Sequence, residues 1–388
     1  MKLEGVRVLD LSAFLPGPWL TMAMADHGAD VVMVEPANGV GEPTRHIGER
    51  DADGTSVWFR NVARGKRSLK IDLKDAEAHA VFLRLVDAAD VMVEAFRPGV
   101  VDRLGVGPDA MTARNPRLIY CQLSAFGQTG PLRDRPAHDP AIQAMAGTVD
   151  LNRGLEDGLP TLPNMPAADM AASLAALSAI LMALYRRETT GRGDVIDLSM
   201  HDALLSWTPN VSGSVLARGA PPDPKSMRSF GGAAMNNVYE TRDGRFLVLG
   251  GAEPKFAANL LGSLGRPDLA PLAREEAGPA QAPLRDFLRS TFRARTLSEW
   301  TEALSGIDLA WAPVNTLADS LLGEHAAARG LVVEQEGARH VATPMRFRDE
   351  PGRVVGRVPG YGEHSEELAR DAGLSGAEAG ALRARGAL

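Results

Sequence analysis

The sequence predicts an α/β protein built around a parallel sheet. Short apolar runs of strand length alternate with helix-like segments through the first 125 residues, a pattern typical of strand–helix–strand units. Breakers such as Pro16-Gly17-Pro18 separate these runs. We expect strands at 6–11, 28–35, 68–73, 91–94 and 118–124, and helices at 19–27 and 76–88. Because strands and helices alternate, the helices should cover both faces of one sheet.

A second region of different composition follows the first two hundred residues. Residues 206–236 are rich in Pro, Gly and Ser and predict a linker. Residues 238–250 predict a hairpin with Asp243-Gly244 at its turn, which opens a smaller α+β domain over 237–325. We expect 326–388 to be largely irregular and to contain a short helix near 363–372.

Length, charge and cysteine content exclude several classes of protein. A chain of 388 residues is longer than one hydrophobic core usually accommodates, and its length fits two domains. A net charge of -7 argues against a nucleic-acid binder. The single cysteine, Cys121, excludes a disulfide framework within the chain, and its apolar surroundings predict a buried residue. With no signal-peptide pattern at the amino terminus, we expect a cytoplasmic protein.

Asp169 stands at the head of a long apolar helix. Residues 166–185 are rich in Ala, Leu and Met, and Gly191 marks the far end. The uncharged run 170–185 falls short of the ~20 residues that span a membrane, so no membrane partner is expected. The first turn of a helix stabilises an anion through its dipole and free N–H groups. Asp169 therefore fits either a capping acid or a catalytic carboxylate at a pocket wall.

Further acid–base candidates lie near expected strand ends. His138-Asp139 follows a turn-rich stretch after a strand, where α/β proteins place functional residues. Glu253 lies between a strand and Pro254, which also fits an ordinary helix start. The sequence lacks paired metal-ligand motifs, a G-x-S-x-G elbow, a phosphate-binding P-loop and a G-x-G-x-x-G fingerprint. These absences disfavour zinc enzymes, serine hydrolases, P-loop hydrolases and dinucleotide enzymes.

Basic residues cluster where the first domain could meet a polyphosphate. They are Arg64, Lys66, Arg67, Lys70, Lys74, Arg97 and Arg103. We interpret Arg64 and Lys70 as solvated surface charge. Surface charge is also the simpler explanation of Arg133 and Arg135, which could otherwise bind a carboxylate. Phe96-Arg97-Pro98-Gly99 differs, because an aromatic ring, a cation and a rigid turn follow a strand directly. Such a turn can stack a ring and hold a phosphate.

In order along the chain, several motifs resemble those of the family III CoA-transferases, a family that includes the 2-methylacyl-CoA racemases. The motifs lie at 5–11, 16–18, 28–32, 65–74, 96–100, 115–117, 126–131, 169 and 190–193. The match covers the first 205 residues closely and the rest loosely. The resemblance implies a large Rossmann-like domain built from both chain ends (1–205 and 326–388), the inserted smaller domain, and an interlocked homodimer.

The resemblance also implies a binding site for coenzyme A or acyl-CoA as substrate, with no permanently bound cofactor and no metal. The positions that match CoA contacts are Phe14, Leu15, Pro16, Ile71, Lys74, Phe96 and Arg103, and Arg97 joins them from the turn described above. Pro36 and Ala95 depart from the family pattern, where Arg and Asn are usual, so some nucleotide contacts should differ.

Two reactions follow from the resemblance. In the transferases, the aspartate matching Asp169 attacks the thioester carbonyl and forms an anhydride, and CoA passes to a small carboxylic acid. In the racemases, that aspartate and a histidine, here His138, exchange the α-proton. Asp139 and Glu253 also match the racemase pattern. We favour the transferase because Asp169 suffices for it. The racemase is the alternative, and an intact Asp169 disfavours a CoA-binding protein without turnover.

Overall fold

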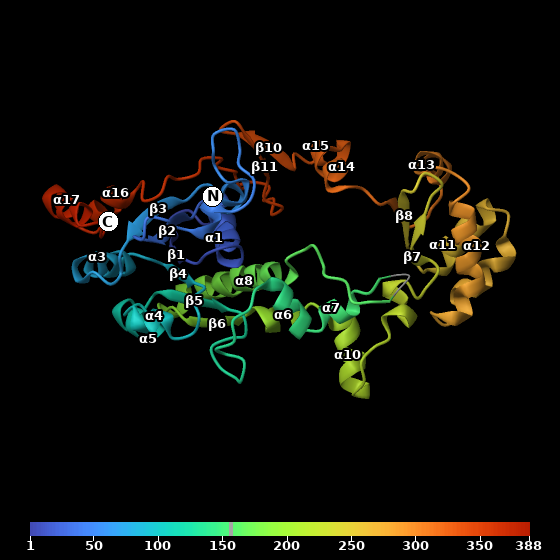
Figure 1. Ribbon diagram of the computed structural model, residues 1–388, viewed down its shortest axis with the longest axis horizontal. Helices are drawn as coiled ribbons and strands as arrows, with labels where there is room; N and C mark the ends of the chain where they lie inside the picture. The colour runs from blue at the N-terminus through green and yellow to red at the C-terminus, as the bar shows by residue number, and fades with distance from the viewer. Residues whose placement is uncertain (155–157) are drawn as a thin grey trace. The chain divides into compact units, whose positions relative to one another are not determined.

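The computed structural model describes residues 1–154 and 158–388, which form two compact units (Figure 1). The first unit comprises Met1–Ala146, Asn164–Trp207 and Glu324–Leu388. The second comprises Gly147–Pro163 and Thr208–Gly323. Each unit has its own buried apolar core.

A six-stranded parallel sheet forms the centre of the first unit, which confirms the predicted fold class. The strands are β1 (Arg7–Leu11), β2 (Asp30–Pro36), β3 (Arg67–Ile71), β4 (Val91–Glu94), β5 (Ile119–Ser124) and β6 (Val195–Ser199). Their order across the sheet is β3-β2-β1-β4-β5-β6. Val8 of β1 pairs with Val31 on one side and Val91 on the other, so β1 and β4 lie at the centre.

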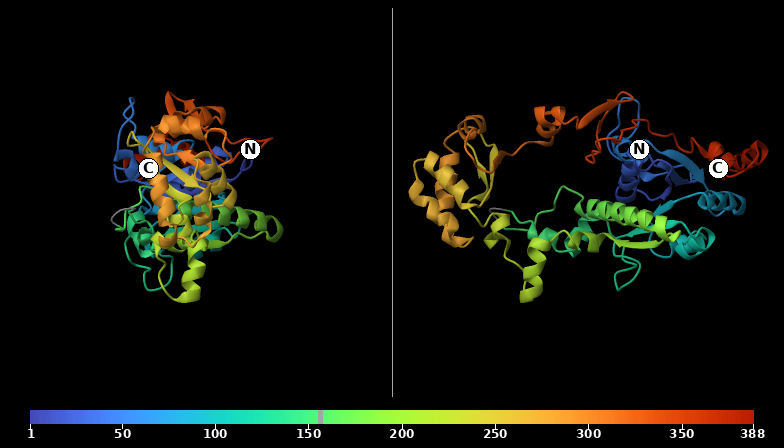
Figure 2. Two further views of the ribbon diagram at one scale, coloured as in Figure 1. Left: turned by 90° about the vertical axis from the view of Figure 1, so that its right-hand side faces the viewer. Right: turned by 180° about the vertical axis from the view of Figure 1, so that it is seen from behind.

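Helices cover both faces of this sheet (Figures 1 and 2). One face carries α1 (Pro16–Asp26), α6 (Asp139–Met145), α8 (Ala167–Thr190) and α9 (Met200–Leu205). The other carries α3 (Ala76–Asp87), α5 (Pro108–Arg114), α16 (Ser365–Asp371) and α17 (Gly376–Ala384). Alternate strand residues point to opposite faces of the sheet. Accordingly, Val8 packs in the core that includes α1 and α8, and Leu9 packs in the core that includes α3 and α16.

The remaining elements of the first unit are short. They are η1 (Pro43–His46), α2 (Val57–Ala63), α4 (Val100–Arg103), α15 (Glu324–Ala328), β10 (Val332–Gln335) and β11 (Ala338–Val341). β10 and β11 form an antiparallel hairpin. The expectation of a largely irregular carboxyl-terminal region was therefore wrong for this hairpin and for α17, since both are too short to show a clear period in the sequence.

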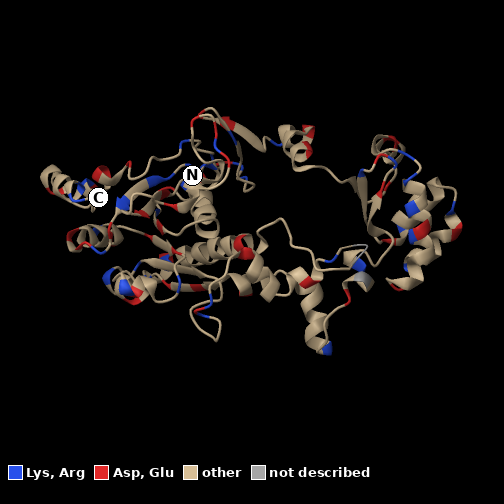
Figure 3. Ribbon diagram, viewed as in Figure 1, with Lys and Arg blue, Asp and Glu red and all other residues tan. Residues whose placement is uncertain are grey.

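Helix α8 runs for 24 residues and ends at Gly191, which adopts the left-handed conformation (φ 68°) typical of a helix end. By length and composition it could cross a membrane. Ala168, Ala172 and Ile180 of this helix are fully buried in the sheet-facing core. Figure 3 shows almost no charge along α8 between its two ends.

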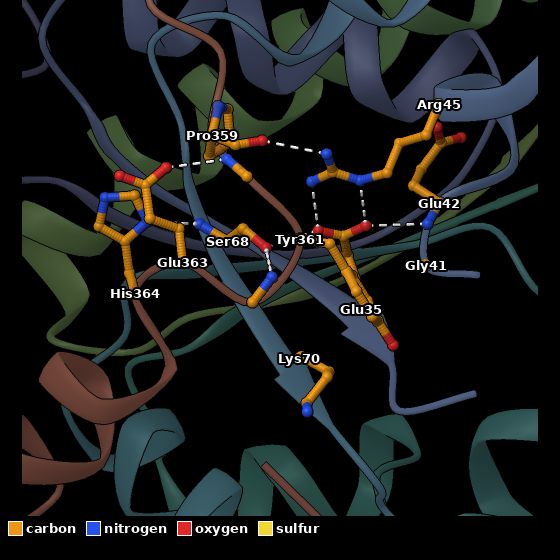
Figure 4. Close-up of polar contacts among 12 residues, drawn as sticks. Glu35, Gly41, Glu42, Arg45, Ser68, Lys70, Pro359, Tyr361, Glu363 and His364 are labelled. Atoms are coloured by element: carbon orange, nitrogen blue, oxygen red, sulfur yellow. Dashed lines mark hydrogen bonds and ion pairs between the residues drawn. The ribbon is translucent and has the colours of Figure 1, made fainter. Parts of the chain in front are cut away.

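The carboxyl-terminal segment before α16 is attached to the outer strands of the sheet (Figure 4). The Gly362 N–H donates to Ser68 Oγ at 2.8 Å, and the Tyr361 hydroxyl donates to the Pro36 carbonyl at 2.6 Å. The Ser68 N–H donates to His364 Nδ1 at 3.1 Å. Residues near both chain ends thus share one unit.

The second unit contains a three-stranded antiparallel sheet in the order β7-β8-β9. The strands are β7 (Asn236–Glu240), β8 (Phe246–Gly250) and β9 (Trp311–Pro313). β7 and β8 confirm the predicted hairpin. The main helices are α11 (Pro254–Ser263), α12 (Ala282–Phe292) and α13 (Leu297–Leu304). Shorter elements are α7 (Thr148–Leu151), α10 (Pro209–Arg218), η2 (Pro224–Ser226), η3 (Arg228–Phe230), η4 (Pro267–Arg274), η5 (Pro279–Gln281) and α14 (Leu317–Leu322). Residues 206–236, expected as a linker, thus contain regular structure.

Candidate functional site

The first unit contains a cleft of about 660 Å³ at the carboxyl ends of its central strands. The strand order reverses direction between β1 and β4. Open α/β sheets bind ligands at such a point, because the loops after the two strands diverge there. Residues following β1, β4, β5 and β6 line the cleft, together with the first turns of α6 and α8. The sequence candidates among its lining residues are Phe14, Pro16, Phe96, Arg97, Arg133, Arg135, His138 and Asp169.

Asp139, rather than Asp169, caps helix α8. Asp139 Oδ1 accepts the N–H groups of Ala168 at 2.8 Å and Asp169 at 3.1 Å. Its Oδ2 accepts Gln143 Nε2 at 2.5 Å, and Asp139 is buried. Within residues 1–154 and 158–388, no group donates a hydrogen bond to the Asp169 carboxylate. Asp139 therefore accepts the free N–H groups at the start of α8, so the Asp169 carboxylate is not needed as a cap and remains available in the cleft.

Burial raises the pKa of the Asp169 carboxyl to about 7, and the negative charge of Asp139 contributes to the rise. Removal of water disfavours the charged form of a carboxyl group, and a neighbouring anion acts in the same direction. Asp169 therefore changes its protonation state near neutral pH, where a group can both accept and return a proton.

His138 lies in the same cleft as Asp169. It precedes α6 as its N-cap residue, and its side chain is exposed. Its imidazole packs edge to face against the Phe14 ring, with the ring centroids 5.7 Å apart and the planes at 78°. The structure thus brings His138 and Asp169, 31 positions apart in the sequence, to one cavity.

Glu253 belongs to the second unit and is not among the residues that line this cleft. There it is the exposed N-cap residue of α11, directly before Pro254.

A fully buried ion pair supports the loop that carries Phe14. Lys66 Nζ lies 3.0 Å from Asp10 Oδ2, and it also donates to the Pro18 carbonyl at 2.9 Å. Ser173, one turn after Asp169, donates its hydroxyl to the Pro16 carbonyl at 2.8 Å. This loop is therefore attached both to the sheet and to α8.

Three basic residues expected near a polyphosphate instead make structural ion pairs. Lys66 is paired with Asp10 as described, and Arg64 lies buried 2.9 Å from Asp26 Oδ2. Arg67 contacts Asp30 Oδ2 at 2.6 Å. The interpretations of Lys66 and Arg67 as ligand-facing cations, and of Arg64 as solvated charge, were wrong, because the acids that pair with them lie far away in the sequence.

Arginine side chains gather around the turn after β4. A β-carbon at Gly99 would lie 3.5 Å from Arg103 Nη1 and 3.9 Å from Arg133 Nη2, so both guanidinium groups lie beside this turn. Arg97 and Arg135 line the adjoining cleft. In the described residues, no carboxylate pairs with Arg97, Arg103 or Arg135, and Arg133 contacts only the exposed Asp134, at 3.5 Å. This surplus of guanidinium groups suits a phosphate or carboxylate ligand.

Four of the expected contact residues do not line the cleft, and one of them is Arg103, which lies beside the turn at Gly99. Leu15 lines a separate groove beside α1. Ile71 is 2% exposed and belongs to the core beneath the sheet. Lys74 is exposed beyond the end of β3.

Sequence reasoning missed Glu94, at the end of β4. Glu94 is 1% exposed, and its Oε2 accepts the Phe96 N–H at 2.7 Å, which fixes the turn that enters the cleft. Burial raises its pKa to about 7. Only the acidic character of the last strand residue could have indicated this contact.

The comparisons with known proteins agree with this arrangement. The family model described as CoA-transferase family III matches residues 3–365. The chain belongs to CoA-transferase family III. It is 33% identical to the α-methylacyl-CoA racemase of Mus musculus over 386 residues, 97% of this chain and 94% of the relative. It is also 33% identical to the acetyl-CoA:oxalate CoA-transferase of Acetobacter aceti over 375 residues, 95% of each chain.

Among solved structures, this family III member is similar to a CAIB/BAIF family protein from Brucella suis. The TM-score is 0.84 at 30% sequence identity, and the match covers 95% of this chain and 99% of the other. The resemblance found in the sequence is thus confirmed, and the relatives include both reaction types. Family III enzymes use CoA thioesters as substrates. Within residues 1–154 and 158–388, no group of three His, Cys, Asp or Glu side chains could hold a metal ion.

Proposed function

We propose that this family III enzyme transfers CoA from an acyl-CoA to a small carboxylic acid through Asp169. The Asp169 carboxylate adds to the thioester carbonyl, the C–S bond breaks, and CoA leaves as a thiolate. The thiolate attacks the aspartyl carbonyl of the resulting anhydride, which releases the donor acid and leaves CoA on Asp169. The acceptor carboxylate displaces the thiolate to form a second anhydride. Attack of the thiolate on the acceptor's acyl carbon then gives the new thioester and restores Asp169.

One observation carries this proposal: a carboxylate without a hydrogen-bond donor shares a cleft with three arginines, of which Arg97 and Arg135 have no carboxylate partner among the described residues. Asp169 is the one carboxylate among the described residues that line the cavity, whereas Arg97, Arg133 and Arg135 line it as well. The cations suit both the phosphates of CoA and an anionic acceptor. We assign CoA contacts to the residues at or beside the cleft, namely Phe14, Pro16, Phe96, Arg97 and Arg103.

Thioester exchange in deuterated water tests the proposal. The purified enzyme is incubated with a (2R)-2-methylacyl-CoA, with and without succinate, oxalate or malate, and the thioesters are analysed by mass spectrometry. We expect a new thioester only when an acceptor is present. Asp169→Asn should abolish it, whereas Glu188→Gln, at the exposed far end of the same helix, should not. Deuterium at the α-carbon without an acceptor, and no new thioester with any acid, would overturn the proposal.

Racemisation of a 2-methylacyl-CoA is the second candidate. It is favoured by the presence of His138 in the cleft and by the pKa of about 7 at Asp169. Two such groups could remove the α-proton from one face and return a proton to the other. His138→Ala separates the candidates, because it should stop deuterium exchange in a racemase and leave substantial activity in a transferase.

We further propose that the enzyme works as an interlocked homodimer. The outward side of α8 supports this, because Leu174, Leu181, Met182 and Tyr185 are exposed there and are 40–81% accessible. Apolar side chains gathered on one helix face typically contact another protein surface. Light scattering should give twice the mass of one chain, and Met182→Glu with Tyr185→Glu should lower it. A monomer that retains full activity would contradict this part of the proposal.

A further inference from the structure

Phe14 is held in a backbone conformation that side chains with a β-carbon rarely adopt. Its φ is 68°, and among the described residues only Glu336 shares a positive φ outside glycine. In the left-handed region the β-carbon approaches the following carbonyl oxygen, which is unfavourable for a bulky residue. Surrounding contacts must therefore impose this conformation, and such enforced strain is concentrated at functional sites.

The Glu42 carboxylate contacts the Phe14 backbone directly. The Phe14 N–H donates to Glu42 Oε1 at 2.8 Å. The Thr44 N–H donates to Glu42 Oε2 at 2.8 Å, and the Thr44 hydroxyl donates to the same oxygen. Glu42 is 4% exposed. One oxygen of a buried carboxylate therefore binds the loop after β1, and the other binds the segment after β2.

A second buried carboxylate fixes Glu42 in turn (Figure 4). The Glu42 N–H donates to Glu35 Oε2 at 2.8 Å. Arg45 makes two hydrogen bonds to the Glu35 carboxylate, at 2.8 and 2.7 Å, and a third to the Pro359 carbonyl at 3.0 Å. The Ser68 hydroxyl donates to Glu35 Oε1 at 2.5 Å. Because these groups come from separate segments of the first unit, Glu42 cannot shift without breaking several of these bonds.

The ring that Glu42 holds in place contacts His138. The two ring centroids are 5.7 Å apart at 78°, and both residues line the cleft with Asp169. In the part of the chain that the structure describes, no hydrogen bond reaches the His138 imidazole. The edge-to-face contact with Phe14 is therefore the specific interaction that orients this imidazole.

We propose that Glu42 is a positioning residue for the cleft. By holding Phe14 in the left-handed conformation, its carboxylate fixes the ring that orients the His138 imidazole beside the bound acyl group. The consequence for catalysis rests on the racemase candidate of the proposed function, in which His138 moves a proton, whereas the contact itself does not. Glu42 is buried and does not line the cleft. Its loss should therefore lower kcat with little change in the KM for acyl-CoA.

Histidine NMR tests the contact without relying on activity. The enzyme is labelled at the histidine Cε1 carbon, and the His138 signal is identified by its loss in His138→Ala. Phe14→Leu removes the ring and should move this signal through the lost ring current. Glu42→Ala should move it comparably, and Glu42→Gln, which keeps an oxygen for the Phe14 N–H, should leave it near its original position. Glu363→Gln, which removes a carboxylate from the neighbouring carboxyl-terminal segment, is the matched control and should leave the signal in place.

An unmoved His138 signal in Glu42→Ala would overturn the proposal. Should that variant fail to fold, Glu42→Asp replaces it, since it keeps the charge and shortens the reach by one methylene. An unmoved signal in Phe14→Leu would equally refute the ring contact.

Kinetics tests the consequence for catalysis. We expect the kcat for α-proton exchange to fall about tenfold in Glu42→Ala, because small misplacements of an active-site group have large effects on rate. The Glu42→Ala/Phe14→Leu double variant should lose no more than Phe14→Leu alone, and multiplied losses would contradict the proposal. Full activity in Asp169→Asn would refute the proposed function but leave the NMR result standing. A full rate of α-proton exchange in Glu42→Ala, with Asp169→Asn inactive, would refute only the positioning role.

Discussion

Replacement of Asp169 by Asn should stabilise the unliganded enzyme, by an amount that grows as the pH rises from about 4 to 7. Burial, together with the Asp139 charge, raises the Asp169 pKa from 3.8 to about 7. Between these two values the folded protein keeps a proton that the unfolded chain has lost, so the wild-type carboxyl loses stability as the pH rises. Below this window both states are protonated, and above it both are ionised. Asparagine has no proton to lose, so the difference between the proteins should grow through the window and then stay constant.

The size of the effect follows from the two pKa values. A rise of about three pH units corresponds to roughly 4 kcal/mol, at about 1.4 kcal/mol per unit. Asp169 retains some contact with solvent, which screens its charge, so we expect roughly 2–4 kcal/mol at pH 8. For a unit of this size, each kcal/mol shifts the melting temperature by about 2 °C, which gives roughly 4–8 °C.

Thermal unfolding from pH 4 to 8, followed by circular dichroism or calorimetry, measures this difference. The melting temperatures of wild type and Asp169→Asn should nearly coincide at pH 4 and separate at pH 8. Glu188→Gln, exposed at the far end of α8, should follow wild type throughout. A difference that does not change with pH, or a less stable Asn variant at pH 8, would refute the reasoning.

Three further outcomes test the surroundings of the cleft. Lys66→Met leaves Asp10 buried without its cationic partner and should lower the free energy of unfolding in urea by about 3–5 kcal/mol. Adding Asp10→Asn should recover much of this loss, and an equally unstable double variant would contradict the pairing. Gly17→Ala, in the first turn of α1, should displace the loop before this helix and lower activity, because its β-carbon would overlap the Ser12 side chain, and Ser12→Gly should restore activity. Cys121 is fully buried with a pKa raised to about 12, so a thiol reagent should label the unfolded chain and not the native enzyme; rapid native labelling would contradict its burial.

Elements with a strong local pattern could be predicted from the sequence. The predicted strand at 91–94 coincides with β4. It consists of three apolar residues and a final Glu94, and the residues on either side interrupt the apolar run. Helix α8 was expected from its Ala- and Leu-rich run and from Gly191. The hairpin of β7 and β8 followed from its Asp-Gly turn. In each case the residues that determine the element are neighbours in the chain.

Partnerships between distant residues could not be predicted. The capping of α8 by Asp139 joins residues 30 positions apart, and the pairing of Lys66 with Asp10 joins residues 56 apart. Without knowledge of these contacts, Asp169 is interpreted as a possible capping residue and Lys66 as a ligand-facing cation. Glu42 gave no signal at all, because its role depends on a backbone angle at Phe14 that local sequence does not reveal.

A crystal structure with a non-hydrolysable thioether analogue of an acyl-CoA tests the central claim most directly. It measures the distance between the Asp169 carboxylate and the carbon that occupies the place of the thioester carbonyl. We predict a separation of about 3–4 Å, within reach of attack, with the CoA phosphates near Arg97 and Arg103. An Asp169 carboxylate facing bulk solvent, or lying on the order of 10 Å or more from that carbon, would contradict a role in the chemistry.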